Sequence, residues 1–405
     1  MKKNYYKLVS AKFLSIIGTY MQSTAFSLYI IDTLHDSFIF ATILMSALLP
    51  KIILGPFGGV FIDWFDRKKF LVSIDLMSSI LLFISALLFG KNLSLPIVYL
   101  ICISLGIMNS VDEPLVVSLI PSLVKKEKLV AANSVNMFST AIGNIIGPIL
   151  GAVVYSSFGV NIILYINAFS FIIGAVLEFT IKIEYKNKNN QSKTILNFFE
   201  DFKAGVTYVV RNRFVFFVVV SIFLQNFFFN GATTVGVPFL AKQILKVSNT
   251  EFAILEITLI LGSIFGLLIA SKIVKNKSLI VLFTKLLFAI SLCFLTIGLI
   301  CIFLLEKQRI AYVFIAIIYI CLGILSMNVN VLFQTEMQKV VDESLFGRVS
   351  SLILSLIMSS IPLGQLVYGY LFKVFHPTVP FVVTFVAICS ISALFSLFLR
   401  SPKLS

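Results

Sequence analysis

Residues 38–90 read FIFATILMSALLPKIILGPFGGVFI (38–62), DWFDRKK (63–69) and FLVSIDLMSSILLFISALLFG (70–90). Two long apolar runs therefore flank one short charged break. A bilayer core about 30 Å thick needs roughly 20 apolar residues per helix, and every backbone polar group inside it must bond within the segment. Each of the two runs therefore predicts a membrane-spanning helix.

The same pattern continues along the whole chain of 405 residues. Hydrophobic residues make up 59% of it and charged residues 12%, whereas soluble domains are about a quarter charged. Apolar runs between charged or turn-rich breaks lie at 8–31, 38–62, 70–90, 96–122, 130–154, 160–182, 214–241, 252–274, 278–304, 310–337, 346–373 and 379–399. The sequence predicts an all-α membrane protein with twelve transmembrane helices.

One polar stretch, Glu184–Lys193, divides the twelve runs into two sets of six. We expect an N-terminal six-helix bundle at 1–183, a cytoplasmic linker with an amphipathic helix at 184–213, and a C-terminal six-helix bundle at 214–405. The motif Leu-Gly-Ile at 105–107 recurs at 322–324, and Gly147 and Gly364 follow at the same offset. The two bundles are therefore expected to be pseudo-symmetric.

The chain has 32 Lys and Arg residues against 18 Asp and Glu residues, a net charge of +14. Most of the basic residues lie in short loops on the side of the membrane where the N-terminus is predicted. This distribution predicts a multi-pass protein of the plasma membrane with both termini cytoplasmic. Because the basic residues form no single amphipathic face, no nucleic-acid partner is expected.

Three ionisable residues are expected deep in the membrane, where such groups are costly and are functional candidates. Lys51 lies twelve residues before Asp63, and Asp112 and Glu113 lie at nearly the same depth in the fourth span. We expect Lys51 to pair with one carboxylate and the other to exchange protons. The alternative is a static ion pair without a transported proton.

The break after the second span resembles the signature G-x-x-x-D-(R/K)-x-G-R-(R/K) of the major facilitator superfamily, with Trp64 as a departure. An Asp at position 66 and another at 75 resemble the drug and macrolide-type efflux branch. The resemblance implies a cytoplasmic latch formed by Gly59, Asp63, Asp66, Arg67, Lys68 and Asp75. The alternative is that the basic residues only set the topology.

A second stretch, Gly143-Asn-Ile-Ile-Gly147-Pro148-Ile-Leu-Gly151, resembles the superfamily's antiporter motif G-x-x-x-G-P-x-x-G. Its three glycines form one stripe that permits close helix approach, and Pro148 favours a bend. The resemblance implies a bendable helix at the interface between the two halves. Ordinary small-residue packing is the alternative. Pro121, Glu127 and Asn133, with Phe346-Gly347-Arg348-Val349, also resemble the efflux branch.

Polar residues in the first, seventh and tenth spans fall on helices that line the central cavity in this superfamily. They are Gln22, Gln225, Asn226, Asn230, Asn328 and Asn330. We expect them to bind an amphiphilic substrate, or else to act as hydrogen bonds between helices.

The sequence predicts a secondary active transporter that exports an amphiphilic, drug or macrolide-like small molecule in exchange for protons by alternating access. The expected partners are the substrate, protons and the lipid bilayer, and the chain is expected to act as a monomer. No G-x-x-x-x-G-K-(S/T) loop, catalytic triad or metal-ligand spacing occurs, so we expect no enzyme, cofactor or metal site. An importer or uniporter of a metabolite and a lipid or siderophore exporter are the alternatives.

Overall fold

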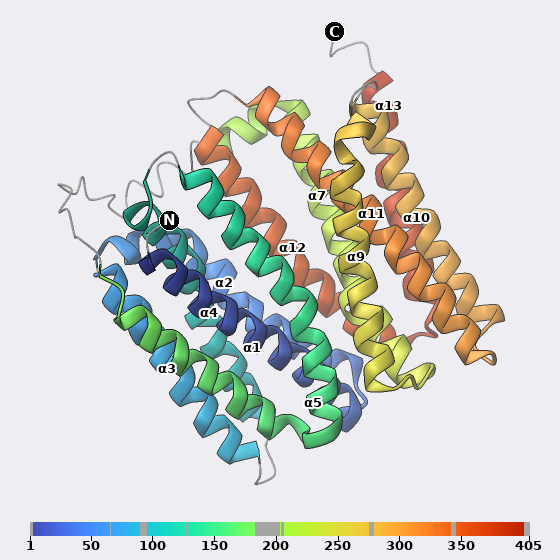
Figure 1. The fold of residues 1–405 in the computed structure, drawn as a ribbon. Helices are drawn as coiled ribbons and strands as arrows, with labels where there is room; N and C mark the ends of the chain where they lie inside the picture. Colours follow the sequence, from blue (N-terminus) through green and yellow to red (C-terminus); the bar gives the residue numbers. More distant parts are fainter. Residues whose placement is uncertain are drawn as a thin grey trace. The chain divides into compact units, whose positions relative to one another are not determined.

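A computed structural model describes residues 3–64, 66–89, 95–125, 128–182, 203, 206–274, 279–341 and 346–400. Within these ranges the regular elements are helices (Figure 1). The first five are α1 (Lys3–Leu34), α2 (Ser37–Trp64), α3 (Arg67–Phe89), α4 (Leu95–Leu123) and α5 (Leu129–Phe179). The later elements are α7 (Arg213–Asn230), η2 (Gly231–Gly236), α8 (Val237–Phe239), η3 (Leu240–Ile244), α9 (Asn249–Val274), α10 (Leu279–Phe303), α11 (Gln308–Val340), α12 (Phe346–Val374) and α13 (Thr378–Arg400).

In the described part of the chain, eleven helices are long and apolar enough to cross a membrane. One of them, α5, has 51 residues, and at 1.5 Å per residue it would measure about 76 Å, more than twice the bilayer core. Gly159 interrupts it with φ 75°, a left-handed conformation that suits glycine. The helix therefore supplies the fifth and sixth spans, and the twelve-span fold class is confirmed.

Pro148 lies inside α5, but the non-helical backbone in that helix is at Gly159. That break falls in the interval expected between the spans at 130–154 and 160–182, while Pro148 keeps a helical backbone. An interior proline can bend a helix without any non-helical residue, so the bend expected at Pro148 stays a prediction.

The chain forms two compact units. Unit 1 comprises Met1–Thr33 and Ser46–Phe198, and unit 2 comprises Leu34–Met45 and Phe199–Ser405. The short segment 34–45 joins unit 2 because Ser37 Oγ donates a hydrogen bond of 2.8 Å to Gly369 O and Lys373 Nζ lies 2.7 Å from Asp36 Oδ2. Most of the expected linker falls outside the described residues, so its boundaries stay a prediction.

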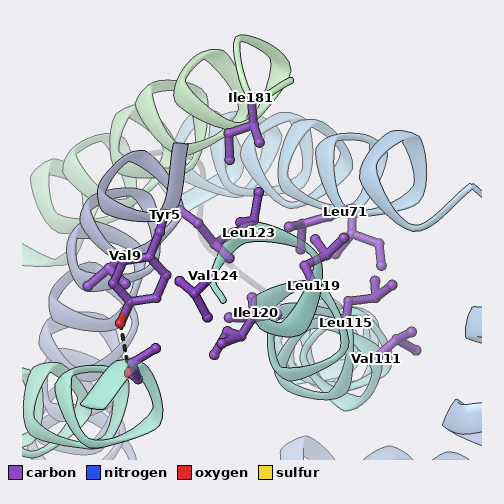
Figure 2. Packing of buried hydrophobic residues seen from close by; sticks show 14 residues of the cluster. Tyr5, Val9, Leu71, Val111, Leu115, Leu119, Ile120, Leu123, Val124 and Ile181 are labelled. Carbon is purple, nitrogen blue, oxygen red and sulfur yellow. Dashed lines mark hydrogen bonds between the residues drawn. The ribbon is translucent and has the colours of Figure 1, made fainter. Parts of the chain in front are cut away.

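Apolar side chains of α1, α3 and α4 form the core of one end of unit 1 (Figure 2). Helix α4 contributes Val111, Leu115, Leu119 and Leu123, which recur every four residues and so share one face. Tyr5 is fully buried among them, and its hydroxyl donates a 2.7 Å hydrogen bond to the backbone oxygen of Ala132. This packing fixes α1 against α4 and α5.

In unit 2, α9 packs along α11, α10 along α13, and α7 with η2 along α12. The π-helical turn η2 widens the seventh span and changes the pairing of its backbone carbonyls. Thr233 O accepts a 2.8 Å hydrogen bond from the hydroxyl of Tyr319, and Thr234 Oγ1 accepts one of 3.1 Å from Gln365 Nε2. Side chains of α11 and α12 thus hold this turn in place.

Candidate functional site

Four charged residues of unit 1 come from four different helices and interact with one another. They are Lys12 of α1, Asp75 of α3, Asp112 of α4 and Glu178 of α5, and we call them the acid cluster. Lys12 Nζ forms an ion pair with Asp112 Oδ2, and the two side chains are 15% and 12% exposed. Electrostatic interactions connect Lys12 and Asp112 to both Asp75 and Glu178. The pair is therefore one end of a larger charged group.

Asp75 and Glu178 form the other end of the acid cluster, and each is 3% exposed. A Cβ atom on Gly174 would lie 2.8 Å from Asp75 Oδ2 and 3.2 Å from Ser15 Oγ, so this glycine makes room for the Asp75 carboxyl group. Glu178 follows Gly174 by one helical turn on the same face of α5. Its side chain hydrogen-bonds that of Asp75.

The charges of the acid cluster do not balance when every member is ionised. Three carboxylates and one ammonium group carry a net charge of −2, which is costly at membrane depth. A hydrogen bond between two carboxyl groups also requires a proton on one of them, because a carboxylate can only accept. The cluster can therefore hold a proton, and Lys12 can compensate one remaining charge.

The described residues contain no group of three His, Cys, Asp or Glu side chains arranged to hold a metal ion.

Two members of the acid cluster were expected from the sequence, and two were not. Asp112 was expected as an intramembrane acid and Asp75 as part of the latch motif. Lys12 reads as a positive-inside residue, although at 1.5 Å per residue it lies about 14 Å from the start of α1. Glu178 reads as the polar end of the sixth span. A comparison of depths along neighbouring spans would have placed both near Asp75.

Asp112 forms an ion pair with Lys12, a partner not expected from the sequence, and the expected pairing of Lys51 with Asp112 or Glu113 stays a prediction. Lys51 is exposed and comes from α2, whereas the Lys12 side chain reaches Asp112 from α1. The side chain of Glu113 lies outside the described residues. Its pairing with Lys51, and its part in proton exchange, stay predictions.

Side-chain contacts of the latch motif are described from Asp66 onward. Asp66 Oδ1 accepts hydrogen bonds of 3.0 Å from the backbone N–H groups of Lys68 and Lys69 and so caps the start of α3. Arg67 Nη1 donates a 3.3 Å hydrogen bond to Ser118 O on α4. These contacts lie within unit 1. The surroundings of the Gly59 and Asp63 side-chain positions lie outside the described residues, and the latch stays a prediction.

The glycine stripe of α5 packs against α1. A Cβ atom on Gly151 would lie 2.5 Å from Met21 O, and one on Gly147 would lie 2.5 Å from Tyr20 Cβ. Gly143 similarly faces Ile16. The expected close helix approach is therefore present. Its partner is α1 of the same unit, and the implied place of this helix at the interface between the two halves stays a prediction.

The expected substrate residues have different surroundings. Gln22 is buried, and its Oε1 accepts a 2.5 Å hydrogen bond from Asn167 Nδ2 of α5. Asn328 is also buried and donates to Gly266 O of α9 at 3.2 Å. These two contacts favour the alternative of hydrogen bonds between helices.

The other expected substrate residues make hydrogen bonds along their own helices. Asn226, Asn230 and Asn330 each donate to the carbonyl four residues earlier, and Gln225 is buried beside Asn226. Asn330 is exposed, so its side chain can be reached from outside the protein. Substrate binding by these residues stays a prediction.

The chain is similar in sequence to known membrane transporters. A family model described as Major Facilitator Superfamily matches residues 8–365. The uncharacterized MFS-type transporter YkuC of Bacillus subtilis is 28% identical over 361 residues, covering 86% of this chain and 81% of YkuC. Macrolide efflux protein A of Streptococcus pyogenes is 22% identical over 374 residues, covering 90% of this chain and 88% of its own.

Solved structures share the fold at low identity. A mutant of the nucleoside transporter NupG aligns with a TM-score of 0.79 and 14% identity over 98% of this chain and all of its own. A bacterial homologue of the iron transporter ferroportin in an inward-facing state aligns with a TM-score of 0.75 and 15% identity, covering 98% of this chain and 99% of its own.

Proposed function

This chain belongs to the major facilitator superfamily, and from that membership we propose that it exports an amphiphilic small molecule in exchange for protons by alternating access. It is a multi-pass membrane transporter rather than an enzyme. The proposed substrate class is drug or macrolide-like, because two of its relatives are macrolide efflux proteins A, from Streptococcus pyogenes and Enterococcus faecalis.

The acid cluster is the observation that supports proton exchange. Its carboxyl groups come from α3, α4 and α5 and share the counter-charge of Lys12 of α1. A proton that binds the Asp75 and Glu178 pair removes one negative charge, and Lys12 then stays in its ion pair with Asp112. Departure of that proton draws Lys12 toward the newly ionised pair. Each proton thus changes which helices the lysine connects, which is a physical route from protonation to helix movement.

The first experiment identifies a substrate. Deletion and overexpression strains are compared for susceptibility to macrolides, dyes and siderophores, and an exporter is expected to lower susceptibility when overexpressed. Accumulation of a compound in overexpressing cells would instead indicate an importer or uniporter, and an unchanged panel would favour a metabolite or lipid substrate.

The second experiment tests the coupling. Purified protein in vesicles is given a pH gradient, and substrate movement is measured for Asp75→Asn and Glu178→Gln. Both variants are expected to lose gradient-driven transport and to keep substrate exchange without a gradient, because they bind no exchangeable proton at that position. Glu306→Gln removes an equal charge at an exposed site and is the matched control. Gradient-driven transport at the wild-type rate in both variants would refute coupling by this pair.

A further inference from the structure

A carboxyl group in unit 2 lies apart from every motif discussed above. Glu256 belongs to α9, inside the apolar segment Asn249–Ala270. It lies about 10 Å along the helix from Asn249, at 1.5 Å per residue. Its Oε1 atom is buried and accepts no hydrogen bond from the residues that the structure describes. A buried polar atom without a partner is rare in native proteins and requires an explanation.

The surroundings of Glu256 hold no compensating charge in the described part of the chain. The titratable group that faces it is the phenol of Tyr319 on α11, the helix along which α9 packs. That hydroxyl already donates to Thr233 O in η2 at 2.8 Å. Among the described residues, no Lys, Arg or His interacts electrostatically with Glu256.

Tight packing leaves little room for water on the α11 side. A Cβ atom on Gly266 of α9 would lie 2.7 Å from Ile324 O, and one on Gly262 would lie 2.9 Å from Ile320 Cα. The two backbones are thus nearly in contact within two to three turns of Glu256. The Glu256 side chain is half-buried, and an ionised carboxylate with a buried oxygen and no cation beside it is costly, so the neutral acid is the favoured form.

Glu251, at the start of α9, provides the contrast. Its Oε2 accepts hydrogen bonds of 2.8 Å from the Ser248 backbone N–H and 2.9 Å from Ser248 Oγ, and Glu251 N–H donates to Ser248 Oγ in return. This reciprocal arrangement is a capping box that stabilises the start of the helix. Glu251 therefore has a structural explanation that Glu256 lacks.

We propose that Glu256 is a proton-carrying site of unit 2, separate from the acid cluster of unit 1. Loss of its proton places a negative charge beside Tyr319. The carboxylate then competes with Thr233 O as acceptor for the Tyr319 hydroxyl. Thr233 O then loses its donor, and the π-helical turn η2 loses a contact with α11. Protonation of Glu256 is in this way linked to the shape of the seventh span. Only its role in transport rests on the proposed function.

The proposal is tested by infrared difference spectroscopy on the full-length protein in lipid vesicles, without substrate, as the pH is raised. A protonated carboxyl group has a C=O band that disappears on ionisation. Glu256→Gln is expected to remove one such band, whereas the matched control Glu251→Gln keeps it. A Glu256→Gln spectrum identical to the wild type would overturn the proposal, as would a Glu256 carboxylate that is already ionised and responds to Na⁺.

Two further measurements keep the result interpretable. Glu256→Asp retains a carboxyl group, so it is expected to restore a band at a shifted position even if Glu256→Gln unfolds. Tyr319→Phe removes the facing hydroxyl and is expected to shift the pH at which the band disappears, and an unchanged midpoint would refute the link to η2. If a pH gradient drives no transport by the wild-type protein although the band is present, the proposed antiport is refuted and the proposed protonation of Glu256 is still supported.

Discussion

At the scale of single residues, Lys12 decides how much negative charge unit 1 can hold inside the membrane. Its ammonium group forms an ion pair with Asp112 and interacts electrostatically with Asp75 and Glu178. A buried pair is strongly destabilised when one partner is removed, because the remaining charge has no compensation. The lysine is thus a structural requirement of the cluster as well as part of its proposed chemistry.

Replacement of Lys12 by Met is therefore expected to lower stability in a pH-dependent way. At neutral pH the loss is about 3 kcal/mol, because Asp112 loses the cation of its ion pair. At a pH low enough to protonate the carboxyl groups, no negative charge is left without a cation, so the difference from the wild type shrinks. Thermal unfolding of the purified protein at several pH values measures the effect.

Lys7 on the same helix is the control for this prediction, because its Nζ donates a 2.7 Å hydrogen bond to Thr180 Oγ1 at an exposed site. Lys7→Met is expected to cost about 1 kcal/mol or less at every pH. A Lys12→Met deficit that is equal in acid and at neutral pH would show that packing, not charge, explains the effect.

At the scale of elements, the glycines of α5 permit close contacts with α1 and with the Asp75 side chain of α3. The first part of α5 packs on α1 through Gly147 and Gly151, and its second part holds the space for Asp75 at Gly174. Gly159 turns the chain between the two parts. One helix thus positions α1, which bears Lys12, and also contributes Glu178 to the acid cluster.

Gly151→Ala is expected to destabilise the protein by roughly 1–3 kcal/mol, because the new methyl group meets the α1 backbone at Met21. Gly298→Ala is the matched control in α10, where the nearest atom to an added Cβ is 3.4 Å away at Val382 Cγ2. There the better helix propensity of Ala is expected to raise stability by up to about 1 kcal/mol. Unfolding temperatures in detergent provide the comparison, and equal changes at the two sites would contradict it.

At the scale of the whole molecule, the excess of Lys and Arg on one side of the spans sets the expected orientation. Because the number of spans is even, both termini are expected on that basic side. The turn at Gly159 then lies on the opposite side, because it follows five spans. This orientation also fixes the direction in which a proton gradient would act on the acid cluster.

Cysteine labelling tests the orientation. In a background with the five native cysteines replaced by Ala, Ser157→Cys is expected to react with a membrane-impermeant thiol reagent in intact cells. Lys69→Cys is expected to react only after the cells are permeabilised. Both side chains are exposed, so access across the membrane is the variable. The reverse pattern would place the termini outside the cell.

Much of the fold was predictable because the bilayer imposes a simple rule on sequence. Apolar runs of sufficient length must be helices, and their number follows from the breaks between them. The glycine stripe of α5 likewise predicts a close helix contact, since small residues permit it wherever the partner lies. The family could also be recognised from the spacing of Gly59, Asp63, Arg67 and Lys68.

The composition of the acid cluster depends on tertiary structure. Sequence spacing gives the depth of a charge along its own helix, but the rotation of that helix and its neighbours decide which charges meet. Lys51 and Lys12 both lie within spans, and Asp112 forms an ion pair with Lys12. The sequence thus determined the membrane class, the span number and the superfamily. Packing of α1, α3, α4 and α5 decided which carboxyl groups share one lysine, because that choice depends on side-chain direction in three dimensions.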